Sequence, residues 1–283
     1  MKLWLRFSQS NGGDVGRRYA QINIEKRVKQ GFGQGRGRGY KPWLIAQSFS
    51  SLGYTTRVQG WKTGREHHLM SDLELNCFFT FDFSPRVLDV REQFPLLPVD
   101  ETLAIADALG IRHPVDLKTK RPIVLTTDFL VTIRAEPRDV DVARTVKPAS
   151  ALQSVRTLEK LQIERSYWKT RNIEWAIITD LEIPQTLVRN LRWLHPYVEM
   201  PQMPALPENC ANKVDSMLRE SLESGQSLAA GAQSCDDRLG LEPGTSLALA
   251  RHFIASRRWN VNLNERIDPT LPLKIASDVL SPM

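Results

Sequence analysis

The sequence predicts an α/β fold in which a large mixed domain, residues 1–180, precedes a smaller helical domain, residues 181–283. Between residues 71 and 179, segments rich in β-branched residues alternate with amphipathic ones, in the order helix, three strands, helix, strand. Hydrophobic residues make up 41% of the 283 and charged residues 25%, which is typical of a globular protein with a real core. Residues 1–180 carry 28 Lys and Arg against 20 Asp and Glu, and the remainder carries 10 against 12, so the charge balance changes near the proposed boundary.

The basic excess of the first part indicates a polyanionic partner such as DNA. Residues 1–17 show little periodicity, and residues 19–30 predict a short basic helix that stops at Gly31. Glycine at alternate positions from 31 to 39 argues against regular structure and lets the backbone approach another group closely. A flexible basic loop without a specific role is the alternative. The side chains here that suit phosphate binding and stacking are Lys26, Arg27, Arg36, Arg38, Tyr40 and Lys41, with Trp43 beside them.

A helix is predicted from Ser71, after strand-like sequence at residues 43–62. Ser71 and Glu74 have the spacing of a capping box, in which each side chain bonds a backbone amide of the first turn. Glu74 is therefore either a cap partner alone or a functional acid. His67 and His68 are adjacent and lack other spaced ligands, so a zinc site is not expected.

The remaining elements of the first domain follow from pattern and turn residues. The strands are predicted at 87–94, 125–131, 142–148 and 173–179, and the helices at 100–110 and 154–171. If the second and third strands pair antiparallel, Lys147 comes beside the carboxylate of Asp128. An acid on one strand and a lysine on the next is how metal-dependent nucleases of the restriction-enzyme fold build their centre, although a solvated charge pair is the plainer interpretation.

The composition excludes several classes of protein. No apolar run approaches the length of a membrane span, and the first residues, interrupted by Arg6, do not predict a secretion signal. The cysteines, at 77, 210 and 235, are odd in number and lack metal-ligand spacing. We therefore expect a reducing, cytoplasmic setting.

The second domain is predicted to have helices at 183–198, 208–224, 226–240 and 245–258, with a linker at 201–207. Residues 259–264 and 271–275 alternate as two strands of a hairpin, and helices followed by a hairpin suit a winged helix. The acidic balance favours a protein partner at this end, although Arg251, His252, Arg257 and Arg258 can touch DNA locally.

Several long motifs in order resemble the TnsA family, the endonuclease subunits of heteromeric bacterial cut-and-paste transposases. They are HLMSDLEL at 68–75, VLDVREQFPLLP at 87–98, TDFLV at 127–131, VKPA at 146–149, RTLEKL at 156–161 and YKPWL at 40–44. The likeness runs from about residue 20 to 195 and becomes faint beyond.

The resemblance implies a restriction-endonuclease-like catalytic domain, a small winged-helix-like C-terminal domain, and cleavage of the non-transferred strand at the 5′ ends of the transposon. It also implies bacterial, cytoplasmic partners: double-stranded DNA at the transposon ends, the transposase TnsB, which cuts and joins the 3′ ends, and the ATPase regulator TnsC. The catalytic residues fall on Glu74, Asp128 and Lys147. The family commonly has Gln where this chain has Thr145, so only a supporting role is expected for Thr145.

Phosphodiester hydrolysis by such a centre uses one or two Mg²⁺ ions, with Mn²⁺ as a substitute, since Mg²⁺ prefers hard oxygen ligands. The expected ligands are Glu74, Asp128 and the carbonyl of Val146, while Lys147 orients the attacking water. Asp89 and Glu92 are rival acids, and Glu164 is interpreted as a surface charge.

Three functions remain open from sequence. The first is a transposase nuclease subunit, the second a stand-alone restriction or repair nuclease, and the third an inactive DNA-binding scaffold of the same fold. Dependence on partners separates the first two, and metal-dependent nicking separates both from the third.

Overall fold

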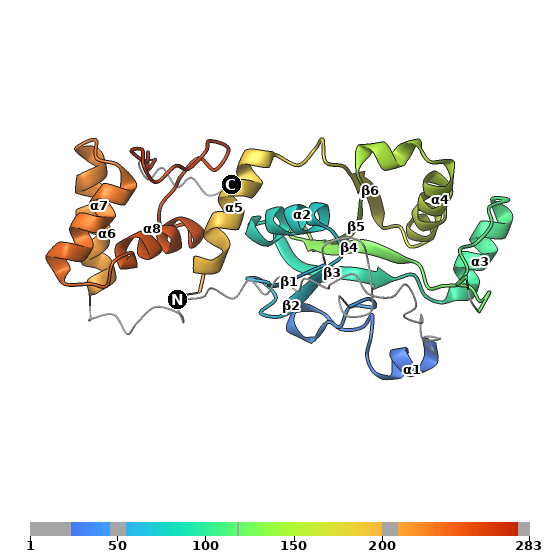
Figure 1. Ribbon diagram of the computed structural model, residues 1–283. Helices are drawn as coiled ribbons and strands as arrows, with labels where there is room; N and C mark the ends of the chain where they lie inside the picture. The colour runs from blue at the N-terminus through green and yellow to red at the C-terminus, as the bar shows by residue number, and fades with distance from the viewer. Residues whose placement is uncertain (1–23, 46–54, 118, 200–208, 277–283) are drawn as a thin grey trace, which may run out of the picture. The chain divides into compact units, whose positions relative to one another are not determined.

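The computed structural model describes residues 24–45, 55–117, 119–199 and 209–276, and the chain divides into two units at Ile183 and Pro184 (Figure 1). The sequence interpretation placed this division at residue 180. The two units are described separately below. No helix of the described residues is long and apolar enough to cross a membrane.

The first unit is built on a four-stranded mixed sheet in the order β3-β4-β5-β6. The strands are β3 (Val87–Pro95), β4 (Thr126–Ile133), β5 (Val140–Val146) and β6 (Glu174–Ile178). The first three are antiparallel neighbours, as predicted for β4 and β5, and β6 runs parallel to β5. A parallel partner needs a crossover, which α4 (Val155–Thr170) provides.

Helices pack on both faces of this sheet because successive strand residues point to opposite sides. Leu130 and Ala143 share a buried cluster with Tyr167 and Trp168 of α4. On the other face, Phe129 meets Phe81 of α2 (Asp72–Phe83) edge to face, with ring centroids 5.5 Å apart. The short helix α3 (Val99–Ala108) lies against α4. The first unit is thus a mixed α/β fold, as predicted.

The N-terminal elements of this unit were predicted only in part. Helix α1 covers Ile24–Lys29, and the earlier residues of its predicted span lie outside the described part of the chain. Strand β1 (Thr56–Gln59) confirms the second part of the strand sequence predicted within residues 43–62. It pairs antiparallel with β2 (Glu66–Leu69), a strand that the sequence did not predict. The predicted strand at residues 43–62 is wrong at its described start, since residues 43–45 form no strand, and residues 46–54 are not described.

The second unit contains four α-helices among its described residues, at the four predicted places. They are α5 (Gln185–Leu194), α6 (Cys210–Glu223), α7 (Leu228–Leu239) and α8 (Thr245–Ala255). Fully buried Leu191, Leu218, Phe253 and Trp259 form part of its core. The predicted linker at 201–207 lies outside the described residues.

The hairpin predicted at residues 259–264 and 271–275 is wrong, because neither stretch forms a strand in the described part of this unit. Trp259 and Leu263 are 1% and 8% exposed, so their alternation reflects anchoring of a loop rather than a strand face. A turn interrupts the first stretch, where the amides of Asn264 and Glu265 bond to Asn262. The hairpin of the winged-helix prediction is therefore absent from residues 209–276.

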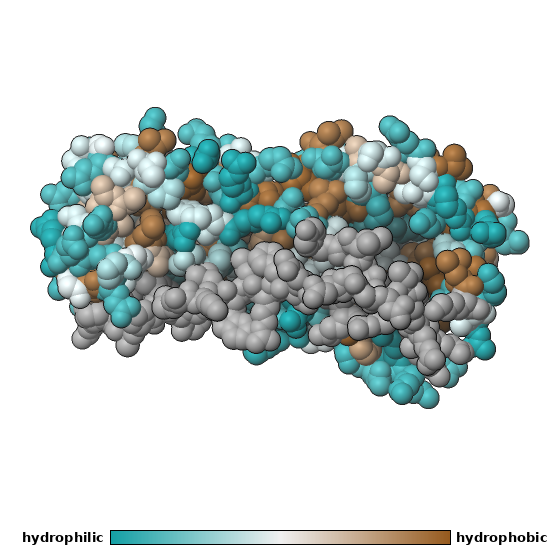
Figure 2. All heavy atoms as spheres, viewed as in Figure 1, coloured by the Kyte–Doolittle hydropathy of each residue, from teal (hydrophilic) through white to brown (hydrophobic). Residues whose placement is uncertain are grey.

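Figure 2 shows hydrophilic and apolar residues interspersed over the visible face of the molecule. The exposed apolar side chains of the described residues include Val155 and Leu158 in the first turns of α4 and Leu181 after β6.

Candidate active site

Asp128 and Lys147 form an ion pair across β4 and the end of β5. Lys147 Nζ lies 2.7 Å from Asp128 Oδ2, and the backbone amide of Val146 donates to the same oxygen at 2.7 Å. Lys147 Nζ also donates to the carbonyl oxygen of Val146 at 2.9 Å. Burial alone would lower the pKa of Lys147, but the charges of Asp128 and of nearby acids outweigh it and the pKa is raised. The lysine is therefore held as a cation.

Glu74, in the first turn of α2, supplies a second carboxylate near Asp128. Ser71 caps the helix by accepting from the Glu74 amide, and its hydroxyl donates to Glu74 Oε1 at 3.1 Å, so the predicted capping box is confirmed. Glu74 Oε2 accepts from the amide of Met70 at 2.9 Å. Burial, followed by the charge of Asp128, raises the pKa of Glu74 to about 7. Both carboxylate oxygens therefore accept hydrogen bonds at the start of the helix, and the charge of Asp128 reaches the same carboxylate.

Gln93 is a residue of this site that the sequence reasoning missed. It is 3% exposed, and its Nε2 donates to Glu74 Oε2 at 3.2 Å. Thr126 Oγ donates to Gln93 Oε1 at 3.1 Å. The only sequence signal was a polar residue inside an otherwise buried strand.

Glu164 was interpreted as a surface charge, and this is wrong. It is 6% exposed, on the face of α4 that packs on the sheet. Its Oε1 accepts from Thr127 Oγ at 2.7 Å, from Trp175 Nε1 at 3.0 Å and from the hydroxyl of Thr145. Burial first, and the charge of Asp128 second, raise its pKa to about 7. Because other charged residues surround Glu164 along this helix, the sequence pattern did not distinguish it as a buried acid.

Thr145 therefore contacts the acid behind the sheet. It is 1% exposed and both its described side-chain contacts go to Glu164 and Trp175. A direct role in metal binding is not part of this geometry, because the Thr145 hydroxyl donates to Glu164.

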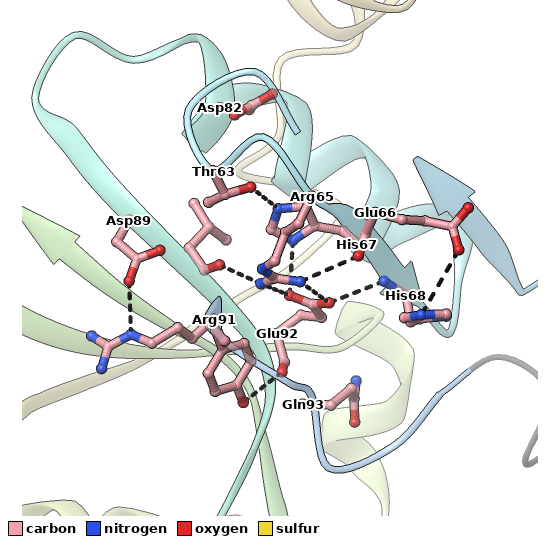
Figure 3. A network of polar contacts seen from close by, with 12 residues as sticks. Thr63, Arg65, Glu66, His67, His68, Asp82, Asp89, Arg91, Glu92 and Gln93 are labelled. Carbon is pink, nitrogen blue, oxygen red and sulfur yellow. Dashed lines mark hydrogen bonds and ion pairs between the residues drawn. The ribbon is translucent and has the colours of Figure 1, made fainter. Parts of the chain in front are cut away.

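The rival acids Asp89 and Glu92 belong to other contacts. Figure 3 shows Arg65 and His67 pointing at the Glu92 carboxylate, with contacts to Oε2 of 2.5 and 2.8 Å. Burial alone would raise the pKa of Glu92, but the pairing with His67 and Arg65 outweighs it and lowers the pKa well below its usual range. Asp89 accepts from the Gly37 amide at 3.1 Å and lies 3.4 Å from Arg91 Nε. Both acids are structural in this arrangement.

The glycine-rich segment, defined here as residues 31–43, packs on β3 rather than standing free. Tyr40 is 4% exposed, and its hydroxyl donates to the Glu92 carbonyl at 3.0 Å. Trp43 is 1% exposed. The expectation that these two rings stack on nucleic acid is therefore wrong, because they are buried in the protein. A Cβ at Gly33 would clash with the ring of Pro95, so the glycines serve this close packing.

The basic residues of this region remain nearer the surface. Lys26, Arg38 and Lys41 are exposed, whereas the Arg27 guanidinium lies over the rings of Phe32 and Trp43 and bonds the Trp43 carbonyl. Arg36 pairs with Asp141 at 2.9 Å on the surface. In this segment the basic side chains of Arg38 and Lys41 are exposed, whereas the aromatic rings of Tyr40 and Trp43 are buried.

The donor set near Asp128 fits a hard divalent cation. Two carboxylates, a backbone carbonyl and one lysine gather there. The pKa of Glu74 is raised first by burial and second by the charge of Asp128, and a bound cation would offset this second effect. Among the described residues, no group of three or more His, Cys, Asp or Glu side chains could hold a metal ion. Remaining ligands would come from water or from a phosphate, as is usual for Mg²⁺.

Comparison with known proteins identifies the family to which the chain is similar. A family model described as TnsA-like endonuclease N terminal matches residues 84–180, and one described as TnsA endonuclease C terminal matches residues 182–263. The chain is 48% identical over 177 residues to the transposon Tn7 transposition protein TnsA of Escherichia coli, a stretch that covers 62% of this chain and 63% of the relative. The match of the N-terminal model includes Asp128, Lys147 and Glu164 but begins after Glu74.

Proposed function

The chain belongs to the TnsA endonuclease family, and from this premise we propose that it is the DNA-cleaving subunit of a cut-and-paste transposase. In this role it cuts the non-transferred strand at the 5′ ends of the transposon, together with a TnsB-type transposase and a TnsC-type regulator. We propose a restriction-endonuclease-like fold for the first unit, supported by the mixed sheet with helices on both faces. The chain aligns with only 63% of its relative, so the whole relative's partners and activity enter here as proposals.

The observation that carries the proposal is the Asp128–Lys147 pair on adjacent strands, with Glu74 close enough for its pKa to respond to Asp128. Glu74, Asp128 and the Val146 carbonyl would hold Mg²⁺, which when bound neutralises charge at phosphorus and stabilises the leaving oxygen. The two hydrogen bonds described for Asp128, from the Val146 amide and from Lys147 Nζ, are both accepted by Oδ2 and not by Oδ1.

Lys147 supplies the positively charged group of the proposed site. Its ammonium is fixed by two acceptors, Asp128 Oδ2 and the Val146 carbonyl, both of which belong to the proposed metal-binding groups. With its raised pKa it stays charged, so it orients the attacking water and stabilises developing negative charge rather than removing a proton. Glu74 must lose its proton before it can coordinate a cation.

The test is strand-resolved cleavage of a transposon-end duplex in Mg²⁺, with the protein alone and with its TnsB and TnsC partners. We expect nicking at the 5′ ends only when the partners are present. Asp128→Ala and Lys147→Ala should reduce nicking to background, at least about 1000-fold, because each removes a group that acts directly on the reaction. Assembly with the partners, measured by co-sedimentation, should persist.

Each other outcome favours a different function. Cleavage by the protein alone would point to a stand-alone nuclease, and absence of cleavage under both conditions to a scaffold. Glu174→Gln, which removes an exposed charge paired with Arg144 at the neighbouring strand, is the matched control and should cleave normally.

A further inference from the structure

Gln93 has a backbone conformation that its residue type disfavours. Its φ is +49°, in the left-handed region, within the buried strand β3. The register pairs Glu92 with Phe129 and Phe94 with Thr127, so Gln93 and Asp128 lie opposite each other at this irregular point. Strained non-glycine residues of this kind persist where the surroundings hold them, often at functional sites.

The side chain of Gln93 joins the catalytic acid to the sheet. A carboxylate is an acceptor, so the amide nitrogen faces Glu74 Oε2, at 3.2 Å. The amide oxygen is then left for the Thr126 hydroxyl, which donates to it at 3.1 Å. Both ends of the amide are therefore committed, and its orientation is fixed.

Neighbouring residues hold the backbone of Gln93 in place from both sides. The Trp43 amide donates to the Gln93 carbonyl at 3.2 Å, and the Tyr40 hydroxyl bonds the carbonyl of Glu92. The Glu92 side chain is anchored by Arg65 and His67, and Gln93 follows it directly on β3 (Figure 3). Tyr40 also stacks on Phe94, with the rings 8° from parallel.

We propose that Gln93 is a positioning residue that aims Glu74 for metal binding, held in its left-handed conformation by the glycine-rich segment. The inference rests on the function proposed above, since it requires a metal at Glu74 and Asp128. Partners of this kind typically change metal affinity by about 10- to 100-fold when removed.

The experiment compares Gln93→Gly with the wild-type full chain. Glycine accepts the left-handed backbone without strain and removes the whole buried side chain, including the amide that faces Glu74. We expect Mn²⁺ binding, measured by calorimetry without DNA, to weaken about 10-fold, and the Mg²⁺ concentration for half-maximal nicking with the partners to rise by a similar factor. The nicking rate at saturating Mg²⁺ should recover toward wild type.

A matched control relieves the same backbone strain elsewhere. Asn172 has φ +53° at the exposed end of α4, so Asn172→Gly should leave Mn²⁺ affinity and nicking unchanged. If Gln93→Gly does not fold, Thr126→Val decides the matter, because it removes only the hydroxyl that orients the amide and should weaken Mn²⁺ binding in the same direction.

Wild-type Mn²⁺ affinity in both variants would overturn the positioning role while leaving the proposed function intact. Loss of nicking at every Mg²⁺ concentration with unchanged Mn²⁺ affinity would also overturn it. A wild-type chain that binds no Mn²⁺ and does not nick with its partners would overturn the proposed function and this inference together.

Discussion

At the scale of single residues, two buried acids in different surroundings have pKa values raised by a similar amount. Glu74 and Glu164 both have pKa values raised to about 7, mainly by burial. Glu74 faces the place where a cation would bind, whereas Glu164 is enclosed by hydroxyl and indole donors behind the sheet. Only Glu74 can exchange its proton for a metal, so the cation affinity of the site should rise with pH through about 7.

Glu164→Gln tests the buried acid without disturbing its contacts, because all three described donors reach Oε1, which glutamine keeps as a carbonyl oxygen. Burial raises the pKa of Glu164 from an ordinary value of 4.5 to about 7, so the neutral carboxyl stabilises the fold fully below about pH 4.5. That stability is lost as pH rises through 7. We expect the variant to match wild type near pH 4.5 and to be more stable at pH 8, by up to about 3 kcal/mol.

Urea unfolding at several pH values measures this difference. Glu159→Gln, a change at a half-buried acid paired with Arg156 on the same helix, is the control and should track wild type throughout. A Glu164→Gln variant whose stability relative to wild type is independent of pH would show that this acid is ionised in the native protein.

At the scale of elements, the glycine-rich segment combines buried aromatic rings with exposed basic side chains, and the two can be separated by mutation. Arg38→Ala should weaken binding to duplex DNA and reduce the salt dependence by about one counterion, because it removes one exposed cation. Tyr40→Phe should bind DNA normally but lose about 1 kcal/mol of stability, since it removes a buried hydrogen bond to Glu92.

Fluorescence anisotropy over a range of salt concentrations, with urea unfolding beside it, distinguishes these effects. Equal losses of DNA affinity in both variants would mean that the buried ring reaches DNA after a rearrangement of the segment.

The elements that sequence predicted well are those whose own pattern decides their structure. β4, β5 and α4 are examples, and so is the Ser71 cap, because local propensity and chemistry agree there. Strand β2 was missed because its polar residue His67 is buried among partners that include Glu92, 25 positions away, and Phe78.

The same reason limits what sequence says of the site. Asp128 and Lys147 could be paired from strand alternation, but the roles of Gln93 and Glu164 depend on Glu74 and on Thr127, Thr145 and Trp175, which only the fold brings to them. In the second unit, the hairpin prediction failed because Trp259 and Leu263 alternate for reasons of loop anchoring.

At the scale of the whole molecule, each of the two units has its own core, and the basic excess lies in residues 1–180. In the second unit, Asp215 links three groups: it accepts from Trp259 Nε1 at 2.6 Å, Arg258 Nε at 2.8 Å and Arg219 Nε at 2.9 Å. In the first unit, a metal ion would bind the folded site and not the unfolded chain. The stability of each unit can therefore be changed separately, by mutation in the second unit and by metal binding in the first.

We expect calorimetric unfolding of the full chain to resolve two transitions that respond separately. Asp215→Ala removes the acceptor of Trp259 Nε1 and of Arg258 Nε and should lower one transition, by the equivalent of about 3 kcal/mol. Saturating Mn²⁺ should raise the other, since a ligand that binds only the native state stabilises it by about 2.7 kcal/mol at 100 times its dissociation constant. A single transition that shifts with both treatments would mean that the units unfold as one body, and metal binding at Asp128 would then be coupled energetically to the C-terminal unit.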